Sequence, residues 1–76
     1  MYREELFIES FANELRRKRE EQSLTLSQLA ENSSVSATFT MRLENGKRKN
    51  ASIEVIFKLA NALEIDISDL VQKCKI

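Results

Sequence analysis

Apolar residues recur every three to four positions through most of the chain, which is the spacing of one face of an α-helix. The first such stripe falls within residues 3–21 and consists of Ile8, Phe11, Ala12 and Leu15. The chain has no proline and one glycine, so it lacks the residues that a turn-rich β protein needs. The pattern therefore predicts an all-α protein made of several helices joined by short polar turns.

The stripe of the first helix continues to Arg19, one turn beyond Leu15. A guanidinium on the inward face of a helix is tolerable only beside a carboxylate, because an unpaired buried charge is costly. Glu44, at the end of a later helical segment, is the candidate partner. We therefore predict an ion pair between Arg19 and Glu44. The alternative is that the helix frays before Arg19 and that this side chain is solvated.

Two short helical segments separated by a polar turn follow the first helix. Thr25 stands three residues before Gln28, which is the spacing of a capping box, so the first segment should begin at about Thr25 and run to about residue 32. The short polar side chains of residues 32–34 favour a turn over a continued helix. Ser36 can then start the second segment as its N-cap. The first segment should supply Leu26, Leu29 and Ala30 to the core, and the apolar residues Leu24 and Val35 should anchor its entry and exit.

The second segment should cover about residues 36–44 and end at Asn45 and Gly46, because glycine readily takes the left-handed conformation that closes a helix. Two helices joined by a turn of about four residues form a helix-turn-helix motif. The sequence therefore predicts this motif at about residues 25–45, an arrangement that reads DNA in many proteins.

Helical rotation divides the segment 36–44 into two faces. Thr40 and Leu43 fall on the inner face, with Phe39 at its edge. Because Thr40 is polar, its hydroxyl should donate a hydrogen bond to a preceding helical carbonyl. The outer face, which we expect to be exposed, carries Ala37, Thr38, Met41 and Arg42.

Two further helices are predicted after a basic loop at residues 47–51. Ser52 can cap the first of them and Asp66 the second. No repeat, linker or low-complexity segment divides the chain, so we expect a single compact domain of five helices over residues 1–76. The apolar residues of the fourth helix fit the helical spacing and are assigned to the core: Ile53, Ile56, Phe57, Ala60 and Leu63.

The C-terminal end offers more apolar residues than one short helix can bury within its own chain. A domain of this size is also marginally stable alone, because it buries only about 60% of the surface of its unfolded chain. Both observations predict a homodimer. The residues expected at its interface are Ile65, Ile67, Leu70, Val71 and Ile76, with Tyr2 and Phe7 as the next candidates.

The formal net charge is zero, with 12 basic and 12 acidic residues, but the charges are unevenly placed. Basic residues form one run at residues 16–19 and another between Arg42 and Lys49, while acidic residues concentrate towards both ends. An isolated basic run is usually just a solvated surface. Beside a helix-turn-helix motif, the second run also suits phosphate binding.

The residue types exclude several other kinds of site. The chain has no histidine and a single cysteine, Cys74, so a zinc cluster and an intrachain disulfide are excluded, and no nucleophile and base can be assembled into an active site. Cys74 is expected to act as a small apolar residue. No apolar run is long enough to span a bilayer, and no signal peptide is recognisable. We therefore expect a cytoplasmic protein that is not an enzyme and uses no cofactor or metal.

From about Phe11 to Leu70, the chain resembles the phage-repressor and Cro type of helix-turn-helix family, also called the xenobiotic-response-element family. The resemblance implies a compact, five-helix, lambda-repressor-like domain that binds operator DNA as a homodimer and regulates transcription. It makes residues 36–44 the recognition helix in the major groove and pairs Arg19 with Glu44. The residues that carry it are Leu15, Arg19, Leu29, Ala30, Val35, Ser36, residues 42–47, Ser52, Ile53 and residues 59–63.

The chain departs from the family pattern at several positions. Leu26 stands where many relatives have Gln, which leaves Thr25 to contact phosphate there. Thr40 replaces the usual core Ile or Val, and Ala51 replaces a common Pro. The Gln pair that reads bases in some phage repressors is absent, so the operator sequence is not predicted.

Phosphate contacts and base contacts should fall to different residues. Arg42 suits guanine, and the methyl groups of Ala37 and Thr38 suit thymine, so these three are the expected readers of base edges. Phe39 can also read from the edge of the face, although partial burial against the first short helix explains it more readily. The expected phosphate-binding residues are Thr25, Ser36, Asn45, Lys47, Arg48 and Lys49.

A function of another class stays open from the sequence: an antitoxin, or another protein-interaction module built on the same fold. The cations between Arg42 and Lys49 favour double-stranded DNA, since a module that no longer binds DNA has no need of them. Repressors, activators and restriction-modification controllers share the fold. With no second domain apparent, we expect no small-molecule ligand and regulation through dimerisation.

Overall fold

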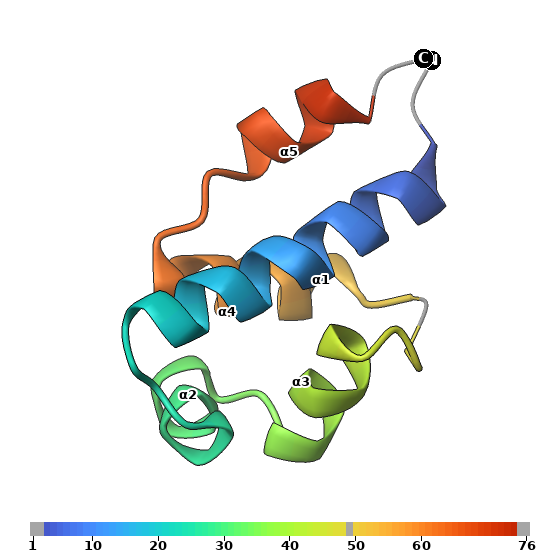
Figure 1. The fold of residues 1–76 in the computed structure, drawn as a ribbon. Coiled ribbons are helices and arrows are strands. Elements are labelled where there is room, and N and C mark those ends of the chain that lie inside the picture. Colours follow the sequence, from blue (N-terminus) through green and yellow to red (C-terminus); the bar gives the residue numbers. More distant parts are fainter. Residues whose placement is uncertain (1–2, 49, 75–76) are drawn as a thin grey trace.

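Five helices make up the part of the chain that the structure, a computed structural model, describes: residues 3–48 and 50–74. They are α1 (Glu4–Glu21), α2 (Leu26–Ser33), α3 (Ala37–Glu44), α4 (Ile53–Leu63) and α5 (Ile67–Lys73). The longest, α1, crosses the middle of the molecule, with α2 and α3 on one side and α5 on the other (Figure 1). None of these helices is both long and apolar enough to cross a membrane.

Side-chain caps fix where the later helices begin. Thr25 and Gln28 form the predicted capping box: the Gln28 amide donates to Thr25 Oγ1 at 3.1 Å, and the Thr25 amide donates to Gln28 Oε1 at 2.8 Å. Ser36, Ser52 and Asp66 cap α3, α4 and α5 by accepting hydrogen bonds from amides of the first turn. Each cap satisfies an amide that has no carbonyl partner within its own helix, so the predicted starting points are confirmed.

Left-handed backbone closes the helices more often than the sequence indicates. Gly46, with φ 74°, follows α3 as predicted. Ser23, Ser34 and Glu64 adopt the same conformation, with φ of 57°, 62° and 59°, at the ends of α1, α2 and α4. Because none of these three is glycine, the usual signal for this kind of helix end is missing from the sequence.

One hydrophobic core joins all five helices. Helix α1 packs against α3, α4 and α5, and α2 packs against α3 and α4. Buried hydroxyls are satisfied within the core: Thr40 Oγ1 donates to Ser36 O at 3.0 Å, as predicted, and Ser33 Oγ donates to Leu29 O at 2.7 Å. The buried hydrophobic residues are Ile8, Phe11, Ala12, Leu15, Leu29, Val35, Leu43, Ile56, Leu59, Ala60, Leu63, Ile65, Leu70 and Cys74.

The prediction that Ile53 and Phe57 belong to the core is wrong. These residues are 74% and 51% exposed, whereas Leu59, which the sequence did not assign to the core, is fully buried. Apolar residues occur on most sides of α4, so contact with α1 and α2 decides which side is buried. In α2, Leu26 and Ala30 are half-buried rather than part of the core.

The predicted dimer residues of the C-terminal end divide into two groups. Ile65 and Leu70 are buried within their own chain, because α5 packs against α1, so they offer little surface to a partner. Ile67 and Val71 are only half-buried. Ile76 and Tyr2, which were also predicted at the interface, lie outside the described residues.

Candidate nucleic-acid interface

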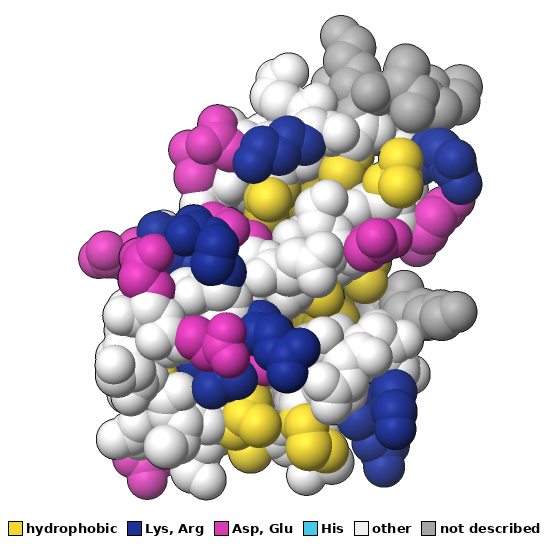
Figure 2. Space-filling model, viewed as in Figure 1, with side chains coloured by type: hydrophobic (Ala, Val, Ile, Leu, Met, Phe, Trp, Pro, Cys, Tyr) yellow, Lys and Arg dark blue, Asp and Glu magenta, His cyan; other side chains and the backbone are white. Residues whose placement is uncertain are grey.

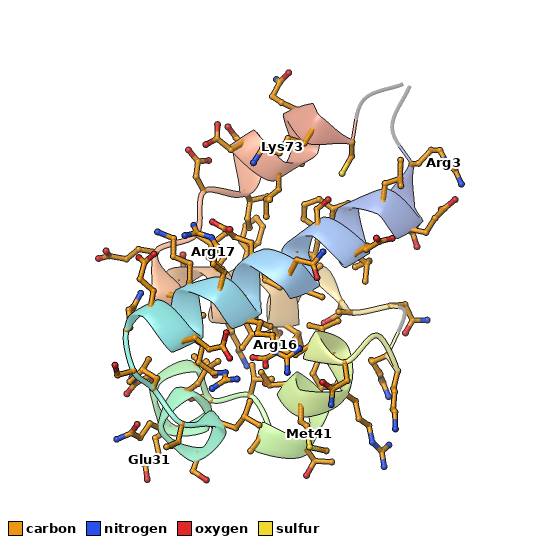
Figure 3. All side chains as sticks on the ribbon, in the orientation of Figure 1. Arg3, Arg16, Arg17, Glu31, Met41 and Lys73 are labelled. Atoms are coloured by element: carbon orange, nitrogen blue, oxygen red, sulfur yellow. The ribbon has the colours of Figure 1, made fainter. Side chains whose placement is uncertain are left out.

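The helix-turn-helix motif forms one end of the molecule. Helices α2 and α3 pack against each other below α1, and α5 lies above it (Figure 1). In Figure 3, Met41 of α3 and Glu31 of α2 project from the lower end, while Lys73 of α5 lies at the upper end. The outer side of α3 is therefore presented at an end of the molecule, where a duplex can reach it.

The outer face of α3 is the one that the sequence predicts. Thr38 and Arg42 are exposed, Met41 is 41% exposed, and Ala37 is half-buried. The neighbouring residues on the inner face, Thr40 and Leu43, are fully buried. The helix thus combines a buried inner face with an outer face that offers a guanidinium, a hydroxyl and methyl groups.

The loop that follows α3 carries the basic cluster. The amides of Lys47 and Arg48 both donate to Arg42 O, at 2.9 Å and 3.2 Å, so the loop is tied to the last turn of the helix. Asn45, Lys47 and Arg48 are exposed, while Lys49 lies outside the described residues. Figure 2 shows basic side chains at its lower right, over this loop and the end of α3.

Arg48 is held against an aromatic ring. Its guanidinium carbon lies 4.7 Å from the centroid of the Phe39 ring, which is within the range of a cation–π contact. Phe39 is half-buried and lines a shallow hollow with Ala51 and Val55, so its ring lies towards the loop and the start of α4. The sequence predicted partial burial of Phe39 against α2; Phe39 is half-buried, but these neighbours belong to the loop and α4, and its contact with Arg48 was not expected.

A buried ion pair fixes α3 to α1, as predicted. Arg19 Nε donates to Glu44 Oε2 at 2.8 Å, and Arg19 Nη2 donates to Glu44 Oε1 at 2.9 Å. The side chains are 14% and 3% exposed, and Arg19 Nη1 also donates to Leu24 O at 2.9 Å. The hydrogen bonds that Arg19 donates to the Glu44 carboxylate raise the pKa of Arg19 above its ordinary value, so the guanidinium stays charged. Two parallel hydrogen bonds set the rotation of α3, and hence the direction of its outer face.

Arg16 is a basic residue to which the sequence assigned no role. Its Nε lies 3.9 Å from Glu44 Oε1, and its side chain is 51% exposed. Figure 3 places Arg16 beside α3, on the side of α1 that faces the motif. One helical turn separates it from Arg19, so helical spacing could have indicated that both approach the same carboxylate.

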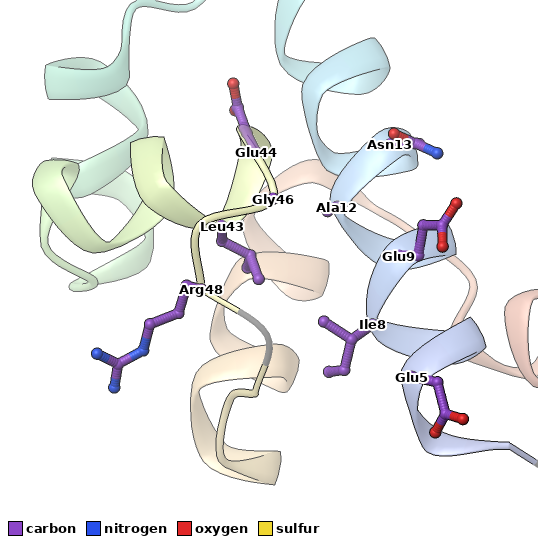
Figure 4. A pocket seen from close by; sticks show the side chains of 9 residues that line it. All are labelled: Glu5, Ile8, Glu9, Ala12, Asn13, Leu43, Glu44, Gly46 and Arg48. Atoms are coloured by element: carbon purple, nitrogen blue, oxygen red, sulfur yellow. The ribbon is translucent and has the colours of Figure 1, made fainter.

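Acidic residues mark one boundary of the basic surface. A groove of about 310 Å³ runs between α1 and the loop after α3, and its lining includes Glu5, Glu9 and Glu44. In Figure 4 Ile8 points towards Leu43 across the floor of this groove, whereas the Arg48 side chain points away from α1. The exposed carboxylates of Glu5 and Glu9 disfavour phosphates in this groove, and the Arg48 side chain, which also lines it, directs its charge to the outer side of the loop.

The remaining predicted phosphate ligands, Thr25 and Ser36, stand at the starts of α2 and α3 and are exposed. Each uses its oxygen to accept a hydrogen bond from an amide of its own helix. An N-terminal helix end offers further amides and a partial positive charge to an anion. The structure thus leaves both residues at the surface where the sequence placed them.

Known proteins share this architecture. The helix-turn-helix family model matches residues 15–70. The HTH-type transcriptional repressor RghR of Bacillus subtilis (strain 168) is 48% identical over 66 residues, which cover 87% of this chain and 49% of that protein. This chain therefore spans about half the length of that curated relative.

A solved structure supports the fold. The crystal structure of the clp gene regulator ClgR from Corynebacterium glutamicum matches with a TM-score of 0.74 and 30% identity, over 95% of this chain and 76% of that chain. The predicted five-helix class and the predicted family are confirmed. Both relatives are named as regulators, in agreement with the expectation that the domain is not an enzyme.

Proposed function

The chain belongs to the helix-turn-helix family, and we propose that it is a sequence-specific DNA-binding regulator of transcription that acts in the cytoplasm on operator DNA. The observation that carries the proposal is the placement of the exposed face of α3 directly beside the exposed cations of the loop that follows it. One surface then offers both hydrogen-bonding groups for base edges and charge for the phosphates that flank them.

In this proposal, the loop after α3 and the N-terminal ends of α2 and α3 bind the phosphates. Lys47 and Arg48 supply charge from the loop, with Lys49 adding a further cation to the same segment of the sequence. Asn45, Thr25 and Ser36 can donate neutral hydrogen bonds to the same strands. These contacts give affinity that falls steeply with salt, because each neutralised phosphate releases counterions.

Base edges are read by the outer face of α3. Arg42 is exposed near the end of the helix and can donate two hydrogen bonds to guanine O6 and N7. Thr38 offers a hydroxyl and a methyl group, and half-buried Ala37 offers a methyl group suited to thymine. Phe39, although counted among the possible readers, has its ring under Arg48, so we assign it a supporting role.

The domain acts as a homodimer in this proposal. A single recognition helix reads only a few base pairs, and two copies related by a twofold axis read two half-sites about 34 Å apart. Of the residues predicted at the C-terminal dimer contact, Ile67 and Val71 are half-buried and so keep surface available to a partner.

The test begins with selection of duplexes from a random pool by the purified 76-residue chain, followed by affinity measurements on selected and random DNA by fluorescence anisotropy. Arg42→Ala should cost roughly 1–3 kcal/mol on the selected site and much less on random DNA. Lys47→Ala should weaken binding to both and lower the salt slope by about one unit. Lys73→Ala, which removes a cation from the opposite end of the molecule, serves as the matched control and should change neither affinity.

Two outcomes would contradict this proposal. Equal losses by Arg42→Ala on both kinds of DNA would make Arg42 a backbone contact and remove α3 as the reading face. If the parent chain bound neither duplex at low salt, DNA binding would be excluded, and the antitoxin or protein-interaction alternative would take its place.

A further inference from the structure

Helix α4 presents two large apolar side chains to solvent. Ile53 is 74% exposed and Phe57 is 51% exposed. They stand four residues apart, so they lie on one face of the helix, one above the other. Small soluble domains seldom expose such residues side by side unless that surface binds another protein.

An apolar groove adjoins these two side chains. It has a volume of about 570 Å³ and lies between the start of α1, the start of α4 and the helix α5. Ile53 and Phe57 line one side of it, and half-buried residues from the other two helices line much of the rest of its accessible wall: Phe7 from α1, and Ile67 and Val71 from α5. Further apolar residues, most of them buried, complete the lining, and the charged residues Arg3 and Glu4 line it as well. The molecule thus carries a projection and a hollow of the same chemistry next to each other.

The charged residues beside Ile53 and Phe57 are arranged so that this surface is complementary to the same surface on a second copy of the chain. Glu54 and Lys58, also four residues apart, flank Ile53 and Phe57, and Lys58 Nζ lies 3.3 Å from Glu54 Oε1. When two α4 helices cross antiparallel about a twofold axis, Glu54 of one copy approaches Lys58 of the other. The Glu54 side chain is 76% exposed and the Lys58 side chain is 43% exposed. Neither is held in the core, so each can leave its partner in the same chain and pair with the opposite charge of the second copy.

We propose that this surface is the homodimer interface, in which Ile53 and Phe57 of each copy insert into the groove of the other and the α4 helices run antiparallel. An isologous contact of this kind uses one patch twice, which is what a projection adjacent to a matching hollow provides. The proposal deepens the proposed function by naming the surface that joins the two DNA-binding domains, but dimerisation itself can be measured without DNA.

The location of the surface is compatible with simultaneous DNA binding. Ile53 begins the helix that follows the basic loop, whereas Thr38 and Arg42 lie on α3, before that loop. Figure 1 shows α5 and the start of α1, which form two walls of the groove, on the far side of the molecule's midline from α2 and α3. A partner on this surface leaves the outer face of α3 uncovered.

Sedimentation of the DNA-free chain tests the interface. The parent should sediment as a dimer that dissociates on dilution, and Phe57→Glu should raise the dissociation constant roughly a hundredfold or more, because the twofold axis places the new charge in the interface twice. Met41→Glu is the matched control: it places the same charge at another exposed apolar position in mid-helix and should leave the dimer mass unchanged. Circular dichroism would establish that both variants are folded.

The antiparallel arrangement is tested by mixing two charge variants, Glu54→Lys and Lys58→Glu. Each variant carries like charges at positions 54 and 58 of its own chain, so the intrachain repulsion is the same whether it self-associates or pairs with the other. Only the mixed dimer brings opposite charges together across the axis. It should form with roughly three- to tenfold preference over the two homodimers, the range expected for exposed ion pairs acting twice.

Several results would contradict the proposed interface. A parent chain that is monomeric at every loading concentration would exclude a second copy as the occupant, as would a folded Phe57→Glu variant of unchanged dimer mass. Random mixing of the charge variants would exclude the antiparallel crossing. None of these measurements depends on DNA. A dimer that fails to bind duplexes would therefore contradict the proposed function but not the proposed interface.

Discussion

Helices α3 and α4 lie on either side of the same loop and present opposite kinds of surface. Around Met41, α3 exposes Thr38 and Arg42, which suit the hydrogen-bonding edges of bases. Helix α4 exposes Ile53 and Phe57, which suit an apolar protein surface. Two neighbouring helices can therefore serve two different partners, and the loop between them connects the proposed DNA-binding face to the proposed dimer contact.

The two helices also differ in how they are held. α3 is anchored by a charged pair, since Glu44 in its last turn accepts two hydrogen bonds from Arg19 of α1. α4 is anchored by aliphatic packing, with Leu59 and Leu63 fully buried. Charged hydrogen bonds define the rotation of a helix closely, whereas aliphatic contacts define it through shape alone. Helix α3, the proposed reading helix, thus has the more directional anchor.

The largest expected effect comes from breaking the anchor of α3. Glu44→Ala leaves the Arg19 guanidinium charged and largely buried without its carboxylate, which should lower the free energy of unfolding by about 3–5 kcal/mol. Thermal or urea unfolding measures this loss. Glu21→Ala, which removes an exposed partner of Arg17, is the control and should cost less than about 1 kcal/mol.

A second variant separates the loss of a partner from the loss of packing. Arg19→Met combined with Glu44→Leu replaces the whole pair by apolar side chains, so it should be more stable than Glu44→Ala alone. If Glu44→Ala instead unfolded together with the parent chain, the pair would contribute nothing to holding α3, and its anchoring role would have to be abandoned.

Within α4, Leu59 and Phe57 should contribute very differently to the stability of the monomer. Leu59→Ala removes a fully buried side chain and should cost about 2–5 kcal/mol by leaving a cavity. Phe57→Ala removes a larger side chain that is half exposed, and it should cost the monomer less than about 1 kcal/mol. Urea unfolding at low protein concentration, where dimers have dissociated, compares the two. If Phe57→Ala lowered the free energy of unfolding by more than about 1 kcal/mol, Phe57 would have to be counted as a core residue.

These contrasts explain what the sequence could and could not predict. Caps such as Thr25 and Ser36 depend on residues within a few positions, and the Arg19–Glu44 pair follows from the cost of an isolated inward charge. The buried face of α4 depends on the helices around it. Because apolar residues occupy consecutive positions from Val55 to Phe57, periodicity alone could not choose that face.

The candidate site also combines features that the sequence predicts with features that depend on tertiary packing. The exposed face of α3 was predicted because helical rotation separates Thr38 and Arg42 from Leu43, and because the helix stands between a tight turn and a basic loop. The stacking of Arg48 on Phe39 was not, since it depends on the path of the loop through space. The approach of Arg16 to Glu44 likewise depends on how α1 and α3 pack.

The ends of the two helices provide a third comparison. α3 is followed by Gly46 and α4 by Glu64, and both residues have left-handed backbone. Gly46→Ala should cost about 1–2 kcal/mol, because an added Cβ is disfavoured at positive φ even though no atom lies within 4 Å of it. Thermal unfolding measures the loss. Unchanged stability would mean that the turn after α3 does not need glycine.

The smallest expected effect is the converse change at the end of α4. Glu64→Gly relieves the strain of a side chain at φ 59°, while the greater freedom of glycine in the unfolded chain offsets part of the gain, so we expect stabilisation of about 0.5–1 kcal/mol. For a domain of this length that corresponds to a rise in Tm of about 2–8 °C. Glu64→Ala is the control, because it removes the same charge but keeps the Cβ, and it should bring no such rise. If both variants raised Tm equally, the gain would come from removal of the carboxylate, and the left-handed backbone at position 64 would not be a source of strain.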